Sequence, residues 1–209
     1  MSVKNKLVFD RLYKSAETYA DLPWHEPEPP ELLVRALDQR AQAGRALDIG
    51  CGAGNYSLYM AQRGYAVTAL DFMPQAVAMV KQRAAEEGWD IEAEQADIKT
   101  WAATEPFDVI LDVGCLHSLA PRDRQPYVAQ INKLLAPGGD FILIHCGKRG
   151  WWDYWPIGPT RVDRLNVIGW FSPPLELKQN VSGRLDDMPL LVGRSARTED
   201  YWFRKALRP

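Results

Sequence analysis

Short apolar runs alternate with amphipathic stretches through the middle of the chain. The apolar runs have the length of buried strands, and the stretches between them repeat apolar residues at helical spacing. Strands are predicted at 45–50, 65–71, 91–97, 107–114 and 139–146, and helices at 55–64, 74–88 and 121–135, with a turn at 136–139. Five strands joined in this way require parallel pairing through right-handed crossovers. The pattern therefore predicts a doubly wound α/β sheet with helices on both faces.

The two ends of the chain continue this pattern less regularly. Residues 4–20 predict a helix that ends before the Pro-rich loop 22–30, and a second helix follows the prolines and stops at Gly44. Near the C-terminus, segments 175–181 and 200–207 suit an antiparallel pair that closes the sheet. Before this pair, 158–170 reads as a helix or an irregular insertion.

Composition limits the classes of protein to consider. The chain has 209 residues, 46% hydrophobic and 25% charged, which is enough for one sizeable core, and we expect a single domain over 1–209. The net charge of −2 gives no overall attraction to nucleic acid or to an anionic membrane. The N-terminal residues lack the apolar run of a secretion signal, and no stretch is long and apolar enough to span a membrane. We expect a cytoplasmic protein.

Cysteine and histidine are scarce. Cys51, Cys115 and Cys146 lie in or beside apolar runs, which suits reduced buried thiols, and their spacing predicts no metal site. Aromatic residues are plentiful, and Trp151, Trp152, Tyr154 and Trp155 are clustered after the fifth strand. Such a cluster either packs in the core or lines a ligand pocket.

A glycine-rich loop follows the first strand. Gly50, Gly52 and Gly54 allow a tight turn and a close approach of the backbone to a ligand, and the next helix presents free N–H groups there. A purely structural turn would explain the same glycines. Asn55 stands where a dinucleotide-binding fingerprint requires a third glycine, so the loop departs from that pattern.

Acidic residues mark the ends of the next two strands. Asp71 is suited to accept hydrogen bonds from ribose hydroxyls, and Asp97 with the backbone of Ile98 to meet an adenine edge. Phe72 and Met73 provide apolar surface for an adenine ring, although both are equally suited to the core.

These motifs together resemble the class I S-adenosylmethionine (SAM)-dependent methyltransferases. The resemblance covers about 45–147 and rests on LDIGCGAG (47–54), Asp71, Asp97–Ile98, FDVILDVGCLHSL (107–119) and INKLLAPGGDFIL (131–143). It implies a seven-stranded Rossmann-like sheet of order 3-2-1-4-5-7-6 with an antiparallel seventh strand. It also implies a lid over 1–44, a cofactor-binding core over 45–147 and an acceptor-pocket insert with closing strands over 148–209.

The resemblance assigns cofactor contacts residue by residue. Asp48, Gly50, Cys51, Gly52 and Gly54 would contact the methionine portion of SAM, Asp71 the ribose, Asp97 and Ile98 the adenine, and Asp112 with Val113 the region of the sulfonium. Tyr13 and Trp24 match the lid residues that cover the cofactor in small-molecule members of the family.

The methyl acceptor is less constrained by the sequence. His117 is the best-placed candidate for a general base, should the acceptor need to lose a proton; a loop histidine that only bonds to backbone is the alternative. His145 is a weaker candidate for substrate contact, and a satisfied core histidine is the alternative. Trp151, Trp152 and Trp155 would favour a planar or apolar acceptor.

The expected function is methyl transfer from SAM to an O, S or N nucleophile of a small molecule. Asp112–Val113–Gly114–Cys115 stands where an Asn-Pro-Pro-Tyr motif would indicate N-methylation of nucleobases, which disfavours that substrate class. Two other classes remain open: an NAD(P)-dependent oxidoreductase of related fold, disfavoured by Asn55, and a SAM-binding protein without catalytic activity.

Overall fold

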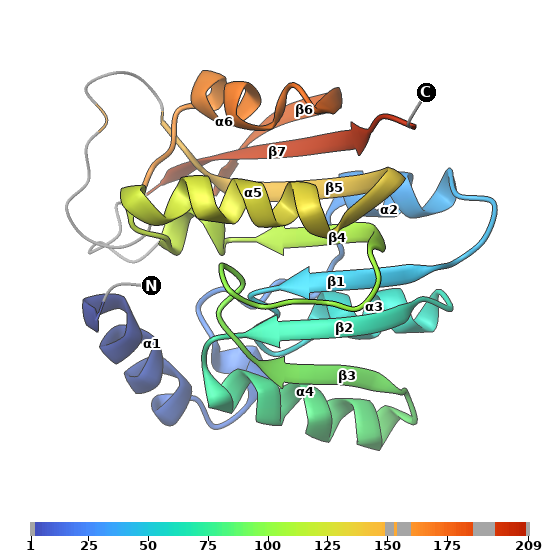
Figure 1. Ribbon diagram of the computed structural model, residues 1–209. Helices are drawn as coiled ribbons and strands as arrows, with labels where there is room; N and C mark the ends of the chain where they lie inside the picture. Colours follow the sequence, from blue (N-terminus) through green and yellow to red (C-terminus); the bar gives the residue numbers. More distant parts are fainter. Residues whose placement is uncertain (1–2, 149–152, 154–159, 186–194, 208–209) are drawn as a thin grey trace.

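One seven-stranded sheet forms the centre of the computed structural model, which describes residues 3–148, 153, 160–185 and 195–207. Its strand order is β3-β2-β1-β4-β5-β7-β6 (Figure 1). The strands are β1 (Arg45–Ile49), β2 (Ala66–Asp71), β3 (Ile91–Gln95), β4 (Phe107–Val113), β5 (Leu135–Gly147), β6 (Leu175–Leu185) and β7 (Ala196–Lys205). The predicted order is confirmed.

Strands β1 to β5 are parallel, and β7 is antiparallel to both of its neighbours, β5 and β6. In the register of the central strands, Asp48 of β1 lies beside Ala69 of β2 and Leu111 of β4. The carboxyl ends of the parallel strands therefore meet at one edge of the sheet, where ligands bind in folds of this kind.

Helices cover both faces of the sheet. Residues of α2 (Glu31–Asp38), α3 (Asn55–Gln62) and α4 (Pro74–Glu87) pack in one core cluster, and those of α5 (Arg124–Leu134) and α6 (Arg164–Phe171) pack in another, on the opposite face. Side chains alternate along β1, so that Ala46 enters the first cluster whereas Leu47 and Ile49 enter the second. Helix α1 (Val3–Ser15) lies beyond the carboxyl ends of β2 and β3 (Figure 1).

Both N-terminal helices end earlier than predicted. Helix α1 stops at Ser15, because the carboxylate of Asp21 accepts hydrogen bonds from the amide (2.7 Å) and hydroxyl (3.0 Å) of Thr18 and starts a short 3-10 turn, Tyr19–Asp21. Helix α2 stops at Asp38, six residues before Gly44.

Two of the parallel strands also differ from the prediction by two residues or more, and the C-terminal pair β6 and β7 is longer than predicted. Strand β5 begins at Leu135, which pairs with Phe107, so 136–139 form an irregular part of β5 where a turn was predicted. Strand β3 ends at Gln95, two residues before Asp97. The predicted helix 121–135 is a 3-10 turn, Pro121–Asp123, followed by α5, and 3-10 turn Leu116–Ser118 precedes both. None of the described helices has the length and apolar character that crossing a membrane requires.

Candidate cofactor-binding site

The glycine loop between β1 and α3 has the backbone conformation that its sequence predicts. Gly50, Gly52 and Gly54 have φ values of +69°, +55° and +82°, a region that other residues rarely adopt. The amides of Gly50 and Cys51 both donate to the carbonyl of Leu70 on β2, at 2.7 and 3.0 Å. The loop is thereby fixed against the sheet, with the first turn of α3 directly behind it.

A small cavity of about 70 Å³ lies above this loop and reaches the end of β4. Its lining includes six residues that the sequence assigned to the cofactor, namely Trp24, Asp48, Gly50, Cys51, Gly52 and Val113. It also includes Tyr19, Leu22, His25, Ala53, Asn55 and Tyr56, which the sequence analysis did not assign. Only their positions in the sequence could have indicated them. Tyr19, Leu22 and His25 lie close to Trp24 in the expected lid, and Ala53, Asn55 and Tyr56 lie next to or near Gly54.

The N-terminal segment closes this cavity from above. Tyr13 is buried, and its ring packs edge-on against Trp24 with centroids 5.4 Å apart. A Cβ atom added to Gly52 would lie 3.3 Å from Nε1 of Trp24 and 3.7 Å from the hydroxyl of Tyr13. Glycine at position 52 thus lets the two lid residues rest on the loop.

A hydrogen-bond network holds the lid to α3 and α4. Arg83 of α4 donates from Nη1 to Oδ1 of Asn55 (2.5 Å) and to the carbonyl of Ala53 (2.8 Å). Because Arg83 can only donate, the amide nitrogen of Asn55 must face the lid, where it donates to Nδ1 of His25 (2.9 Å) and the carbonyl of Glu26 (3.0 Å). We call the network of Arg83, Asn55, His25 and Glu26 the lid latch.

Two buried carboxylates lie beside the glycine loop. Asp48 accepts a hydrogen bond from the hydroxyl of Ser57 (2.6 Å), and burial raises the pKa of Asp48 to about 7. Asp71 accepts from the amides of Gly52 (3.0 Å) and Met73 (2.8 Å), and burial raises the pKa of Asp71 as well. Asp71 therefore connects the glycine loop to the start of α4.

The predicted adenine contacts occupy varied surroundings. Asp97 is partly exposed and forms an ion pair with Lys99 at 3.4 Å. Ile98 is buried in the core cluster on the α5 face, and Met73 is buried near α1 together with the partly buried Phe72. The backbone brings the strand ends together, since the amide of Ala96 donates to the carbonyl of Asp71 at 3.0 Å.

Asp112 lies on the other side of the sheet from Asp48. It is fully buried, accepts hydrogen bonds from the amides of Cys115 (2.7 Å) and Leu116 (3.1 Å) and from the hydroxyl of Tyr127, and does not line the cavity. Burial raises the pKa of Asp112 to about 7. Asp112 thus shapes the loop after β4, whereas its neighbour Val113 faces the cavity. This geometry favours Val113 over Asp112 for the expected contact near the sulfonium.

The two candidate histidines of the acceptor side differ in exposure. His117 is partly exposed, and its Nδ1 accepts a hydrogen bond from the amide of Cys146 at 3.1 Å. His145 is 1% exposed, stacks on Tyr201, and has Nδ1 2.9 Å from the carbonyl of Cys146 and Nε2 3.4 Å from the Tyr201 hydroxyl. Its partners make His145 a satisfied core histidine, which argues against substrate contact. Trp151, Trp152 and Trp155 lie outside the described residues.

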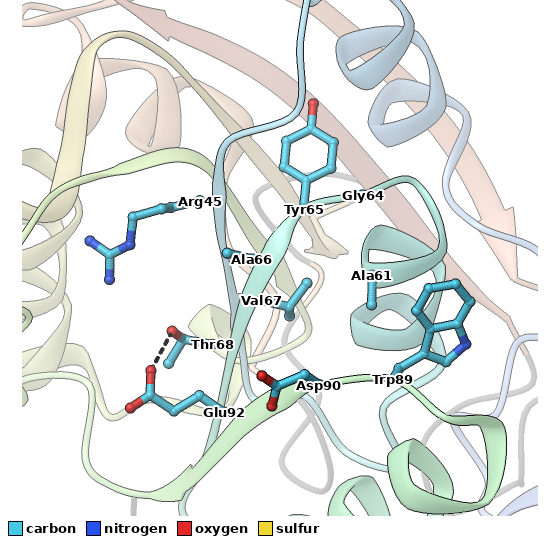
Figure 2. Close-up of a pocket in the computed structure, with 10 residues that line it drawn as sticks. All are labelled: Arg45, Ala61, Gly64, Tyr65, Ala66, Val67, Thr68, Trp89, Asp90 and Glu92. Carbon is cyan, nitrogen blue, oxygen red and sulfur yellow. Dashed lines mark hydrogen bonds between the residues drawn. The ribbon is translucent and has the colours of Figure 1, made fainter.

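A larger hollow of about 490 Å³ lies at the opposite edge of the sheet (Figure 2). It is bounded by the amino ends of β1, β2 and β3, including Arg45, Ala66 and Glu92, and Glu92 is hydrogen-bonded to Thr68 at 3.2 Å. Arg45 points away from its centre (Figure 2) and donates to the carbonyl of Glu105 at 2.6 Å. The hollow gathers no set of converging reactive groups, so the glycine-loop cavity remains the candidate site.

Comparison with known proteins agrees with this assignment. Residues 46–139, which contain the glycine loop and strands β2 to β4, match the family described as the methyltransferase domain. The segment 46–139, a little under half of the chain, is thus similar to a methyltransferase domain, and the sheet has the strand order expected for the class I fold. The N-methyltransferase NodS from Bradyrhizobium japonicum, solved with S-adenosyl-L-homocysteine (SAH), aligns with a TM-score of 0.72 and 22% identity over 95% of this chain and 97% of its own.

Curated relatives of this domain carry two different acceptor names. The 2-heptyl-1-hydroxyquinolin-4(1H)-one methyltransferase of Mycobacteroides abscessus is 32% identical over 124 residues, 58% of this chain and 55% of that protein. Thiocyanate methyltransferase 1 of Arabidopsis thaliana is 30% identical over 128 residues, with the same two shares. The chain thus spans about half the length of the curated relatives that it matches.

Proposed function

We propose that this protein is a SAM-dependent methyltransferase that acts on a small-molecule acceptor. The observation that carries the proposal is the glycine loop, with three left-handed glycines, together with the buried carboxylates Asp48 and Asp71 at the ends of adjacent strands. An oxidoreductase that uses NAD(P) is less well supported, because Asn55 occupies the third glycine position of the dinucleotide fingerprint and belongs to the lid latch.

The residues around the cavity suit the parts of SAM. The backbone of Gly50–Gly54 and the first turn of α3 would receive the methionine portion, Asp71 the ribose, and the Asp97–Ile98 segment the adenine. When bound, SAM supplies an electrophilic methyl group on a sulfonium. The cavity of about 70 Å³ is far below the ~300–1,000 Å³ of typical ligand sites, so Tyr13 and Trp24 must move to admit the cofactor.

The acceptor would approach from the side of the β4 and β5 ends. Small molecules are favoured because both named relatives act on small molecules and because the net charge of −2 offers no general attraction to nucleic acid. The tryptophan-rich segment 151–155 follows β5 in the sequence and supports a planar or apolar acceptor, whose nucleophilic atom is O, S or N. Alignment of acceptor, methyl and sulfur would provide much of the rate acceleration.

Isothermal titration calorimetry with SAH and with NAD tests the cofactor assignment. We expect SAH to bind and NAD to give no response, and Asp71→Ala to weaken SAH binding by about 1.5–3 kcal/mol through loss of hydrogen bonds to a charged group. Asp90→Ala is the matched control, because Asp90 is an exposed aspartate in the hollow at the far edge. Binding of NAD without binding of SAH would reject the proposal.

Release of SAH from SAM in the presence of an acceptor panel tests the activity. The panel contains thiocyanate, 4-nitrothiophenol, 4-nitrophenol and an N-hydroxyquinolinone, with SAM alone as the blank. We expect turnover with at least one of these acceptors. SAH binding without turnover on any small molecule would favour the alternative of a non-catalytic SAM-binding protein.

A further inference from the structure

The backbone N–H and carbonyl of Cys146 in β5 determine which nitrogen carries the proton in two histidine rings. The amide of Cys146 donates to Nδ1 of His117 at 3.1 Å, and the carbonyl of Cys146 lies 2.9 Å from Nδ1 of His145. A peptide N–H can only donate and a peptide carbonyl can only accept. In neutral rings, His117 must therefore carry its proton on Nε2, and His145 must carry its proton on Nδ1.

The free nitrogen of His117 lies beside the end of β4. A Cβ atom added to Gly114 would be 3.3 Å from Nε2 of His117, and Gly114, with φ +92°, directly follows the cavity residue Val113. The ring is partly exposed, and no described residue accepts a hydrogen bond from Nε2. An N–H donor is thus left available where the acceptor would approach the cofactor cavity.

We propose that His117 is a hydrogen-bond donor that orients the methyl acceptor through Nε2–H, and that the acceptor atom it receives has already lost its proton. This inference rests on the proposed methyl transfer and names its substrate class: ionised nucleophiles such as thiolates, acidic phenolates or N-oxide-type oxyanions. A base at position 117 would need an unprotonated Nε2, which the Cys146 amide prevents in the neutral ring.

The described groups that pack closest to His117 offer no proton acceptor. One carboxylate farther along the edge, Asp200 of β7, has an Oδ1 that is buried without a hydrogen-bond partner, and burial raises its pKa to about 6; it pairs with Ile144 and so lies on the face of the sheet opposite to His145. The carboxylate of Asp112 is occupied by two amides and a tyrosine hydroxyl. Burial raises the pKa of both the Cys115 and the Cys146 thiols, and both nitrogens of His145 have partners. Burial, with a smaller effect from His145, lowers the pKa of His117 to about 3, so its ring stays neutral.

A partly buried cation also lies near this edge. Arg124, the first residue of α5, lies over the Trp170 ring at 5.8 Å and has Nε and Nη2 buried without a hydrogen-bond partner in the described part of the chain. Burial lowers the pKa of His145, and the positive charge of Arg124 adds a smaller effect in the same direction. A partly buried cation stabilises an anionic ligand nearby.

The transfer needs no proton acceptor under this arrangement. A lone pair of the ionised nucleophile forms the new bond to the methyl carbon while the carbon–sulfur bond breaks and its electron pair returns to sulfur. Anion and sulfonium thereby become a neutral methylated product and a neutral thioether, and no proton is released. The hydrogen bond from His117 aligns the nucleophile for this in-line displacement.

Nitrogen NMR of the 15N-histidine-labelled protein tests the hydrogen-bond roles without cofactor or turnover. We expect His117 to show protonated Nε2 and unprotonated Nδ1, His145 to show the reverse, and both rings to stay neutral from about pH 5.5 to 8.5. Signals are assigned with His117→Gln and His145→Gln. A proton on Nδ1 of His117, or an imidazolium at His117 in this pH range, would overturn the proposal.

Kinetics with the most active panel acceptor tests the catalytic consequence. Glutamine can accept from the Cys146 amide and donate toward the acceptor, so His117→Gln should keep kcat within about threefold, whereas His117→Ala should lower kcat more than about tenfold. The wild-type kcat should rise with pH through the pKa of the acceptor itself, and the midpoint of this rise should shift when 4-nitrothiophenol is exchanged for 4-nitrophenol.

A different result would identify His117 as a base: both variants would lose at least ~100-fold in kcat, and the pH midpoint would not depend on the acceptor. Failure of SAH binding would reject the proposed function, while the histidine spectra would still decide the roles of the rings.

Discussion

At the scale of single residues, Asp48 shows how burial and charge compete. Its pKa of about 7 in the folded protein compares with ~3.9 for an exposed aspartate. Between these values the folded protein holds a proton that the unfolded chain has released. The contribution of Asp48 to stability is therefore complete below the unfolded pKa and is lost as pH rises toward 7.

Asp48→Asn should remove this pH dependence in the cofactor-free protein. Relative to wild type, the free energy of unfolding of the variant should improve by roughly 1.4 kcal/mol per pH unit between about pH 4 and 7, because asparagine stays neutral. Urea denaturation at about pH 5, 6 and 7 measures this difference, with the exposed Asp90→Asn as the control. A difference that does not change with pH would mean that Asp48 is ionised in the folded protein.

Gly52 offers a second test at this scale. Gly52→Ala should weaken SAH binding by about tenfold or more, because the new Cβ at φ +55° also comes 3.3 Å from Nε1 of Trp24 and displaces the lid. Gly88→Ala is the matched control, since Gly88 has φ +74° at the end of α4 and nothing within 4 Å of the added Cβ. Both variants should lose stability, and calorimetry should find weaker SAH binding only for Gly52→Ala. Equal SAH affinities in the two variants would show that the lid does not rest on Gly52.

At the scale of elements, the lid latch connects the N-terminal segment to α3 and α4. Asn55→Ala removes the three hydrogen bonds of the Asn55 side chain. It leaves the bond from Arg83 to the carbonyl of Ala53 and the contact of the Arg83 guanidinium over the Tyr19 ring at 4.0 Å. We expect the closed lid to lose about 1 kcal/mol of stability. SAH should then dissociate several-fold faster, because the lid opens more often.

Stopped-flow measurement of SAH association and dissociation checks this prediction. Gln82→Ala serves as the control, because the side chain of Gln82 donates to Glu86 of its own helix at 2.8 Å and is not part of the lid latch. Dissociation rates equal to wild type in Asn55→Ala would mean that the apolar contacts of Tyr13 and Trp24 hold the lid without the latch.

The sequence predicted elements best where local pattern decided them. The βα alternation and the glycines located β1 to β4 and helices α3 and α4 to within two residues, because periodicity and capping are local. Predicted boundaries were wrong where contacts with residues distant in the sequence determine the end of an element. Helix α2 ends before Arg40, whose guanidinium bonds to Asp140 (2.9 Å) and Asp108 (3.1 Å), and β5 starts early because Leu135 pairs with Phe107.

The site was predictable in its glycine loop and not in its facing side chains. Gly50, Gly52 and Asp48 could be assigned because their spacing alone places them at the end of β1. Asp112 could not, because its orientation depends on register: it pairs with Ile49, whose side chain faces α5, whereas Asp48 pairs with Leu111 on the α3 face. The lid latch was missed because His25 and Arg83 are 58 positions apart and meet only through Asn55.

At the scale of the whole molecule, Asp140 joins both ends of the chain to the central sheet. It is fully buried in β5 and accepts hydrogen bonds from Arg40 (2.9 Å), from Nε1 of Trp202 (2.7 Å) and from Arg204 (2.8 Å). The N-terminal segment after α2 and the last strand β7 are thus bound to one carboxylate.

Asp140→Ala should lower the free energy of unfolding by about 3 kcal/mol, because it leaves two arginines and an indole N–H without their shared acceptor. Asp108→Ala is the control: Asp108 also bonds to Arg40 but its side chain is 36% exposed, so the loss should be smaller. Urea denaturation followed by tryptophan fluorescence measures both. Equal losses would mean that the burial of Asp140 adds nothing to its contribution to stability.

The hydrogen bonds that fix His117 and His145 come from backbone, and this affects how the whole protein can change by mutation. No side chain at position 146 is needed for them, so exchanges of Cys146 leave both donor and acceptor in place, and of the twenty amino acids only proline removes the N–H. Proline is itself excluded from a central strand. The proton positions of the two histidines therefore depend on the backbone of the sheet. Substitutions in the acceptor pocket can change which substrates fit, while His117 keeps its N–H donor.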